Sequence, residues 1–277
     1  MRPPARVHIA ERPGEDGRSE DRVFAADNAV VVLDGVSPLR SDGDRSGWYP
    51  DALGQRILEL LEVDPAAELP DVLATAIDHV AKKHSLIPGK APASTVSIAR
   101  WDDDHIECLV LGDSPIVVFG RDGGTDVLRD SRHDVVVAGL RRDAGQHIDD
   151  LQELIRATRP AKLARMNRPD GYWIAEATPE AGHRAIVRSW PTEDVRAVLA
   201  VTDGVSCGID EYHVPPSWPS ALALALTDGL EALVDTVHKA EAGDPNCERW
   251  RRPKTHDDKA AALIAFPEPK PSEDETR

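Results

Sequence analysis

Two copies of the same four residues are the first candidates for chemistry. Asp34 and Asp203 each follow an apolar run, and each begins the tetrapeptide Asp-Gly-Val-Ser. A buried strand that ends in Asp-Gly places a carboxylate, with a flexible backbone carbonyl beside it, at the rim of a sheet. Hard divalent cations bind carboxylate and carbonyl oxygens that are held on a rigid scaffold. Taken singly, each pair is more often a simple turn, because Asp-Gly is common after strands.

Three further acidic groups stand at the ends of apolar segments. Glu20-Asp21 precedes VFAA, Asp257-Asp258 precedes AAALIAF after one lysine, and Asp113 follows LVLG. Carboxylates at several strand ends form one cleft only if the sheets bring those ends together. The sequence alone does not establish that convergence, so a metal site is a hypothesis at this point.

Other polar patterns are better explained without chemistry. Asp102-Asp103-Asp104 lies between two predicted strands and is typical of a tight polar turn. His79 and His84 are five residues apart, which does not put them on one helix face, and they are expected at the surface. The motifs of P-loop proteins, of serine hydrolases and of calcium-binding EF-hands are absent from the sequence.

Apolar periodicity predicts the elements that must position these residues. Strands are predicted at residues 6–10, 23–34 (with a break at Asp27-Asn28), 94–101, 105–111, 115–119, 126–129, 172–175, 184–190, 197–201 and 260–266. Helical spacing predicts helices around residues 53–61, 69–80, 148–163 and 219–242. Runs of strands interrupted by helix pairs favour an α+β sandwich with sheets inside and helices outside. One domain over residues 1–267 is expected, with a disordered, Pro-rich and charged tail at 268–277.

Composition narrows the classes of partner. The 277 residues carry 33 basic and 49 acidic side chains, a formal net charge of −16, which argues against nucleic acid or an anionic membrane as partner. Three scattered cysteines without a CxxC pair favour a reducing compartment. The sequence shows neither a signal peptide nor an apolar run long enough to span a membrane. We therefore expect a cytoplasmic protein, whose oligomeric state the sequence leaves open.

The order of the acidic motifs resembles the type 2C, metal-dependent family of serine/threonine protein phosphatases. The similarity spans residues 7–266 and consists of Glu20-Asp21, VVVLDG, STVSIAR, LVLGDS, VLAVTDGVS and DDKAAALIAF in that order. It implies a four-layer αββα sandwich of two mainly antiparallel sheets flanked by helix pairs. It also implies two Mn²⁺ or Mg²⁺ ions at one end of the sheets, where they activate water for hydrolysis of phosphoserine and phosphothreonine in proteins.

The resemblance implies roles for the two Asp-Gly pairs and for the final acidic pair. Asp34 would bridge both ions as the central catalytic carboxylate, with the carbonyl of Gly35 on one of them. Asp203 and Asp258 would bind the first ion directly.

The remaining positions implied by the resemblance lie around that centre. Asp21, with Glu20 as its neighbour, would hold the second ion, partly through water. Asp113 matches the residue associated with a third, weaker ion in bacterial members. Arg18 is the candidate for the phosphate-binding arginine, although a solvated loop charge explains it equally well.

The sequence departs from the family at several positions near the expected site. Val36-Ser37-Pro38 replaces a glycine pair, Pro115 stands where an arginine is common, and Lys259 replaces an asparagine. The aspartates assigned to the metals remain. Metal binding is therefore better supported than efficient catalysis, and two alternatives stay open: a non-catalytic relative that binds a phosphoprotein, and a phosphatase for small phosphorylated metabolites.

Two further expectations concern the surroundings of the site. His256 lies beside Asp258 and either orients that carboxylate or is a plain loop residue. The segment 141–170 is expected to form a flap over the site and to set substrate choice.

Overall fold

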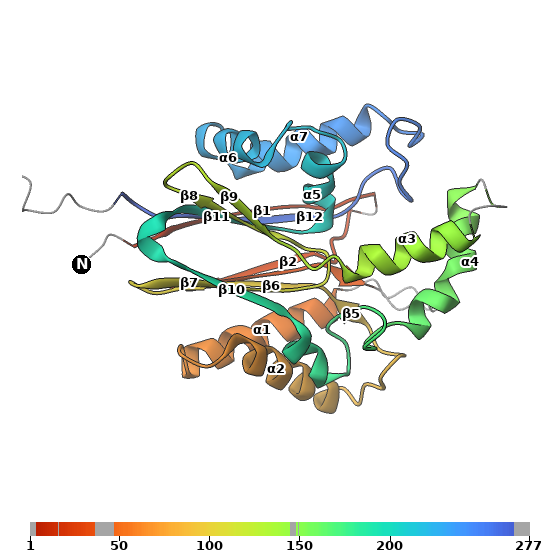
Figure 1. The fold of residues 1–277 in the computed structure, drawn as a ribbon, viewed down its shortest axis with the longest axis horizontal. Helices are drawn as coiled ribbons and strands as arrows, with labels where there is room; N and C mark the ends of the chain where they lie inside the picture. The colour runs from red at the N-terminus through yellow and green to blue at the C-terminus, as the bar shows by residue number, and fades with distance from the viewer. Residues whose placement is uncertain (1–3, 16, 37–46, 145–147, 149, 269–277) are drawn as a thin grey trace, which may run out of the picture.

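Two five-stranded antiparallel sheets pack face to face, and helices cover both outer faces (Figure 1). The computed structural model describes residues 4–15, 17–36, 47–144, 148 and 150–268. This four-layer arrangement confirms the predicted α+β, αββα sandwich. The expected disordered tail lies, except for Glu268, outside the described residues, as do Ser37 and Pro38.

Each sheet is a run of antiparallel neighbours. The first sheet has the order β1 (Arg6–Arg12), β12 (Lys259–Ala265), β11 (Val195–Val201), β8 (Ile116–Gly120) and β9 (Thr125–Leu128). The second has the order β10 (Ile186–Pro191), β7 (His105–Leu111), β6 (Val96–Trp101), β3 (Ala29–Leu33) and β2 (Arg22–Ala26). A short ribbon pairs β4 (Gly35–Val36) with β5 (Ala93–Ser94).

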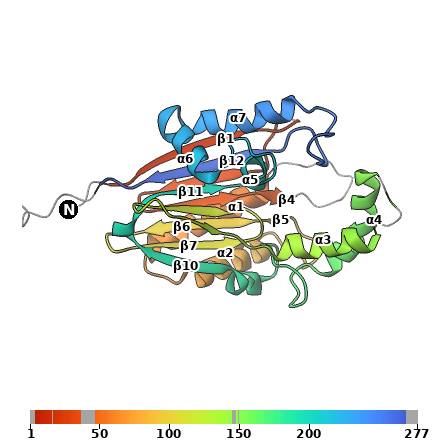
Figure 2. The same ribbon diagram turned by 45° about the horizontal axis from the view of Figure 1, so that its top comes forward.

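The helices form two outer layers and one projection. The second sheet is covered by α1 (Trp48–Val63) and α2 (Leu69–Lys83), and the first sheet by α5 (Asp203–Asp210), α6 (Trp218–Thr227) and α7 (Leu230–Ala242). Figures 1 and 2 show α3 (Arg132–Ala144) and α4 (Leu151–Ala164) side by side beyond one end of the sandwich. Two 3₁₀ turns lie at Pro179–Arg184 and Thr192–Asp194. Within the described residues, the structure contains no helix that is both long and apolar enough to cross a bilayer.

Strand β3 shows why its sequence is apolar throughout. Val30 and Val32 lie in the core between the two sheets. Ala29, Val31 and Leu33 point the other way, into the core beneath α1 and α2. Because successive side chains of a strand face opposite sides, a strand buried on both faces needs a continuous apolar run.

Antiparallel register brings the acidic strand ends to one end of the sandwich. Arg22 pairs with Leu33, so the residues just before β2 and just after β3 lie at the same edge. In the other sheet Val201 pairs with Ala261, which does the same for the end of β11 and the start of β12. The α3–α4 pair and the β4–β5 ribbon lie at this end (Figure 2).

Two predictions about local structure were wrong. The predicted strand at residues 172–175 is an irregular segment that makes only isolated bridges, Ser94 with Ala175 and Met166 with Tyr172. Its backbone is satisfied locally instead, since the Ile174 N–H donates to the Asn167 side chain at 2.9 Å. The predicted strand at 184–190 begins later, at Ile186, because the 3₁₀ turn takes its first residue.

Helix α3 was not predicted. Its sequence contains three consecutive valines and a glycine, all of which have low helix propensity. Packing against α4 overrides that preference, since α3 buries none of its residues fully in the sandwich itself.

Candidate metal centre and active site

Asp34 lies at the junction of β3 and β4, where neighbouring chain fixes its backbone. Its N–H donates to Thr95 Oγ1 at 3.1 Å, and its carbonyl accepts from the Thr95 N–H and from Ser94 Oγ, both at 3.0 Å. Gly35 follows, and a Cβ there would lie 2.7 Å from the carbonyl oxygen of Glu20. Only glycine allows that approach.

The second Asp-Gly pair uses its glycine in the same way. Asp203 is the first residue of α5, and a Cβ on Gly204 would lie 1.9 Å from the carbonyl oxygen of Asp258. Neither Gly204 nor Gly35 adopts a left-handed backbone. Close contact with another segment therefore explains both glycines, and the turn interpretation does not.

Asp21 is a buried carboxylate with an unsatisfied oxygen. It immediately precedes β2 and is 2% exposed, and its Oδ2 has no hydrogen-bond partner among the described residues. Buried acceptors in proteins are nearly always satisfied by a partner, water or an ion. This atom fits a bound cation.

The adjacent residues Asp257 and Asp258 have different surroundings. Both oxygens of Asp258 accept backbone hydrogen bonds, from the Gly14 N–H at 2.7 Å and the Glu20 N–H at 3.0 Å. Asp257 is engaged through Oδ1, which forms an ion pair with Lys254 at 2.5 Å and accepts from the Asp258 N–H at 2.8 Å. Asp258 therefore ties the segment before β2 to the start of β12, whereas Asp257 is the more available carboxylate.

Electrostatics place the separated aspartates in one site. Burial raises the pKa of Asp34 and that of Asp203 well above the usual range, and it raises the pKa of Asp21 to about 8. Neighbouring carboxylates add to each rise: Asp203 acts on Asp34, and Asp257 acts on Asp203. Carboxylates that repel one another in a buried site fit divalent cations, which supply the missing positive charge.

A hollow of about 490 Å³ opens over this cluster. It is lined by the predicted residues Arg18, Glu20, Asp34, Gly35, Asp203 and Asp258, and by Lys162, Lys254, His256 and Asp257 among others. Arg18 is exposed at this hollow, in a position open to an incoming anion.

Asp113, the candidate for a third ion, is paired with a histidine. His133 Nδ1 of α3 lies 2.9 Å from Asp113 Oδ2. Burial opposes protonation of His133, but the carboxylates of Asp113 and Asp134 raise its pKa to about 9. These three residues also have the ligand types and the closeness that a cation site needs. A third ion at Asp113 therefore stays a proposal that competes with the His133 ion pair.

Sequence reasoning missed three residues of the site. Asp257 was visible as half of an acidic pair, but the resemblance assigned only Asp258. Lys162 reaches the hollow from α4, and Lys254 precedes the acidic pair by three residues; no motif marks either lysine. Burial lowers the pKa of Lys162, whereas Asp257 raises that of Lys254 against the effect of burial.

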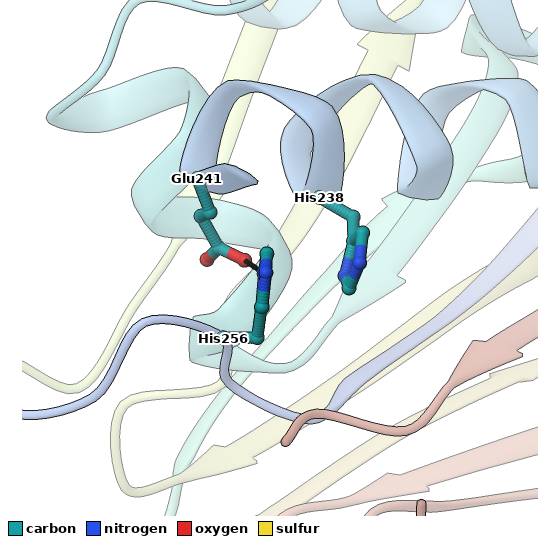
Figure 3. Close-up of side chains that lie close together, drawn as sticks. All are labelled: His238, Glu241 and His256. Carbon is teal, nitrogen blue, oxygen red and sulfur yellow. Dashed lines mark hydrogen bonds and ion pairs between the residues drawn. The ribbon is translucent and has the colours of Figure 1, made fainter. Parts of the chain in front are cut away.

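A second cluster lies behind the site, where α7 faces the start of β12. Figure 3 shows His238, Glu241 and His256 close together, with Glu241 Oε2 3.1 Å from His256 Nδ1. The three have the side-chain types of a metal site. However, Lys259 Nζ already lies 2.6 Å from the buried Glu241 carboxylate. The two imidazole rings are stacked 3.9 Å apart, 13° from parallel, which does not aim their nitrogens at one point.

This second cluster is better explained as a clamp on the acidic pair. His256 and Lys259 flank Asp257-Asp258 in sequence, and both bind Glu241. Lys259 Nζ also donates to the carbonyl of Asp257 at 2.9 Å. His256 thus contacts Glu241 and is neither a hydrogen-bond partner of the Asp258 side chain nor a plain loop residue.

Comparison with known proteins defines the class to which this fold and site belong. A sequence profile of the family Protein phosphatase 2C matches residues 20–243, most of the chain, and the chain belongs to that family. The predicted family and the predicted enzyme class, a metal-dependent serine/threonine phosphatase, are confirmed. The match ends before Asp257, so the roles of the final acidic pair rest on the structure.

Several solved structures of similar fold are described as phosphatases. The chain resembles the catalytic domain of the serine/threonine phosphatase PstP in complex with two manganese ions, at 16% identity and a TM-score of 0.58, over 95% of this chain and 98% of that one. It also resembles the phosphatase MsPP of Mycobacterium smegmatis in complex with cacodylate, at 15% identity and a TM-score of 0.57, over 95% of this chain and 98% of that one. The serine/threonine phosphatase Stp1 of Staphylococcus aureus is similar at 13% identity and a TM-score of 0.59, over 95% of each chain. A search of curated protein sequences found no match. At these identities the structures show a shared fold.

Proposed function

We propose that this protein hydrolyses phosphoserine and phosphothreonine monoesters in proteins, with two divalent ions, Mn²⁺ or Mg²⁺, at the carboxylate cluster. One observation carries the proposal. Carboxylates from four separate segments meet at the end of the sandwich: Asp34, Asp203 and Asp257 line one hollow, and Asp21 is close enough for its charge to raise the pKa of Asp34 and of Asp203.

The structure supports a specific ligand set. Asp34 stands centrally and is proposed to bridge both ions, with the Gly35 carbonyl beside it. Asp203 lies on the side of β11 and β12, and Asp21 on that of β2. We propose Asp257 as the fourth ligand in place of Asp258, because both Asp258 oxygens are engaged by backbone N–H groups.

The chain also offers basic side chains that can bind the phosphoryl group. When bound, the two ions would supply an activated water as nucleophile and would offset charge on the phosphoryl oxygens. Arg18 and Lys162 of α4 both line the hollow, and we propose that they bind the remaining phosphoryl oxygens. The side chain of Val36, which also lines the hollow, is apolar and cannot protonate the leaving alkoxide, and we propose that a water molecule supplies this proton.

The expected surroundings form part of the proposal. The three cysteines are free thiols, which supports a reducing compartment such as the cytoplasm. The family supports a phosphoprotein partner, for which we propose a role in signalling, and the net charge of −16 disfavours nucleic acid.

Two measurements test this function. Purified protein should hydrolyse p-nitrophenyl phosphate and a phosphothreonine peptide when Mn²⁺ is added, and EDTA should abolish both activities. Folded protein that binds Mn²⁺ in calorimetry but turns over neither substrate would overturn the proposed reaction.

A non-catalytic phosphopeptide-binding protein is the second candidate. Lys254 already pairs with Asp257, and the charges of Asp34 and Asp203 act on Lys162, so these lysines partly meet the need for positive charge. Calorimetry that detects phosphopeptide binding without Mn²⁺ binding would favour this candidate.

A further inference from the structure

A second hollow adjoins the carboxylate cluster on the side of α3 and α4. Its volume is about 340 Å³, which is within the range of ligand pockets. It shares Asp34, Asp203 and Lys162 with the hollow over the cluster, so the two are continuous at the site of the proposed reaction.

The walls of this second hollow are mainly apolar. Val137 and Leu140 of α3 and Ile155 of α4 line it together with Trp173. The three helical side chains are only half-buried. Figure 2 shows α3 and α4 beside each other at the end of the sandwich, beyond the two sheets. Their apolar side chains line the hollow there.

Cations stand among these apolar walls. Arg141, Arg159 and Lys162 line the hollow together with the aliphatic and aromatic groups. Asp34, Asp113 and Asp203 line the same hollow, so the basic side chains offset these carboxylates, and the remaining apolar walls favour an apolar group of a ligand.

The position of the hollow defines its occupant. A phosphoryl group held at Asp34 leaves the rest of its molecule to extend into the space that begins there. In an extended peptide, side chains two residues apart face the same side, about 6–7 Å from each other. A peptide whose phosphorylated residue enters the carboxylate site therefore directs its next same-side residue toward this hollow.

We propose that the apolar hollow is a subsite for a bulky apolar side chain of a phosphorylated peptide, two residues from the phosphorylated one. This inference rests on the proposed phosphatase function and names its preferred substrates. It assigns Leu140 and Ile155 as specificity-determining residues.

The experiment compares two phosphothreonine peptides of otherwise identical sequence. One has leucine, and the other has serine, at both positions that are two residues from the phosphothreonine. The wild type should favour the leucine peptide about tenfold in kcat/KM, since apolar discrimination by a pocket is typically 10- to 200-fold. Leu140→Gln combined with Ile155→Gln should reduce that ratio to about two or less. Val135→Gln, on the exposed side of α3, should keep both the ratio and the activity of the wild type.

Equal rates for the two peptides in the wild type would overturn the subsite. An increase in kcat/KM that is seen only when 1-naphthyl phosphate replaces phenyl phosphate, and not with the leucine peptide, would also overturn the subsite, because the occupant would then be a small molecule. Fluorescence anisotropy with the same labelled peptides reports binding without turnover. A leucine preference that is lost in the double variant would support the subsite even in a protein without activity, which separates its failure from that of the proposed function.

Discussion

The two Asp-Gly pairs depend on their glycines as much as on their aspartates. Gly35 and Gly204 let the backbone carbonyls of Glu20 and Asp258 pass within contact distance. Each aspartate is thereby placed against a segment that carries another acidic residue. A side chain at either glycine would push these segments apart. The repeated Asp-Gly dipeptide, which in the sequence resembles two turns, therefore provides two close backbone contacts that bring the acidic segments together.

Asp34→Asn tests the centre of the cluster. Asparagine removes a carboxylate that its acidic neighbours repel, so the fold should persist. The proposed ions lose their shared ligand, so Mn²⁺-dependent phosphatase activity should fall at least ~100-fold. The measurement is kcat/KM with p-nitrophenyl phosphate, beside a thermal melt. Asp103→Asn, in the exposed turn between β6 and β7, is the matched control and should leave both unchanged. Similar behaviour of the two variants would contradict the site.

Asp257→Asn and Asp258→Asn distinguish the two candidates for the fourth ligand. Asp257→Asn should weaken Mn²⁺ binding by about 10- to 100-fold, measured by calorimetry. Asp258→Asn keeps one acceptor for the Gly14 and Glu20 N–H groups and should mainly lower thermal stability. The reverse order of Mn²⁺ affinities would restore Asp258 as the ligand.

At the scale of elements, most strands could be predicted from the sequence, but helix α3, at the end of the sandwich that carries the site, could not. β3, β11 and β12 are apolar on both faces because each lies between two cores, and that pattern is readable. The α3 helix is not readable, because its contacts with α4 outweigh the propensity of its valines. The same limit hid Lys162, since only the placement of α4 brings that lysine to the hollow.

The choice between Asp257 and Asp258 was also beyond the sequence. Both are strand-adjacent carboxylates of the same type, and a motif match cannot tell which one accepts backbone hydrogen bonds. The hydrogen bonds from the Gly14 and Glu20 N–H groups are the basis of our proposal for Asp257, and these groups come from a segment more than 200 residues away in sequence.

Glu241→Gln tests whether α7 positions the acidic pair through the clamp. Glu241 holds His256 and Lys259 on either side of Asp257-Asp258, so its loss should weaken Mn²⁺ binding about 10-fold or more. Breaking a buried ion pair also costs about 3–5 kcal/mol of stability. Mn²⁺ affinity is therefore measured by calorimetry below the melting transition.

The control for this variant must be destabilised without touching the clamp. Leu73→Ala, in the core under α2, should lose about 2–5 kcal/mol of stability and keep wild-type Mn²⁺ affinity. Equal losses of Mn²⁺ affinity in both variants would mean that lower stability, and not the position of Asp257, weakens metal binding.

At the scale of the whole molecule, the acidic cluster belongs to a protein of net charge −16. Self-repulsion of that charge opposes the compact state, and the raised pKa values of Asp21, Asp34 and Asp203 show that ionising these buried groups without a cation is unfavourable. Bound cations should therefore stabilise the fold both by occupying the site and by reducing repulsion. The two effects differ in their dependence on the kind of salt.

Mn²⁺ should raise the melting temperature in a way that simple salt does not. A ligand at 100 times its Kd stabilises the folded state by about 2.7 kcal/mol for each site, which corresponds to roughly 5–10 °C in a domain of this size. Sodium chloride at equal ionic strength screens only the general repulsion, so a smaller shift is expected from it. Asp34→Asn should respond to Mn²⁺ no more than to sodium chloride, because it lacks the carboxylate that both ions would share. A wild-type shift that sodium chloride reproduces would show that the cluster holds no specific ion, and the proposed hydrolysis would lose its physical basis.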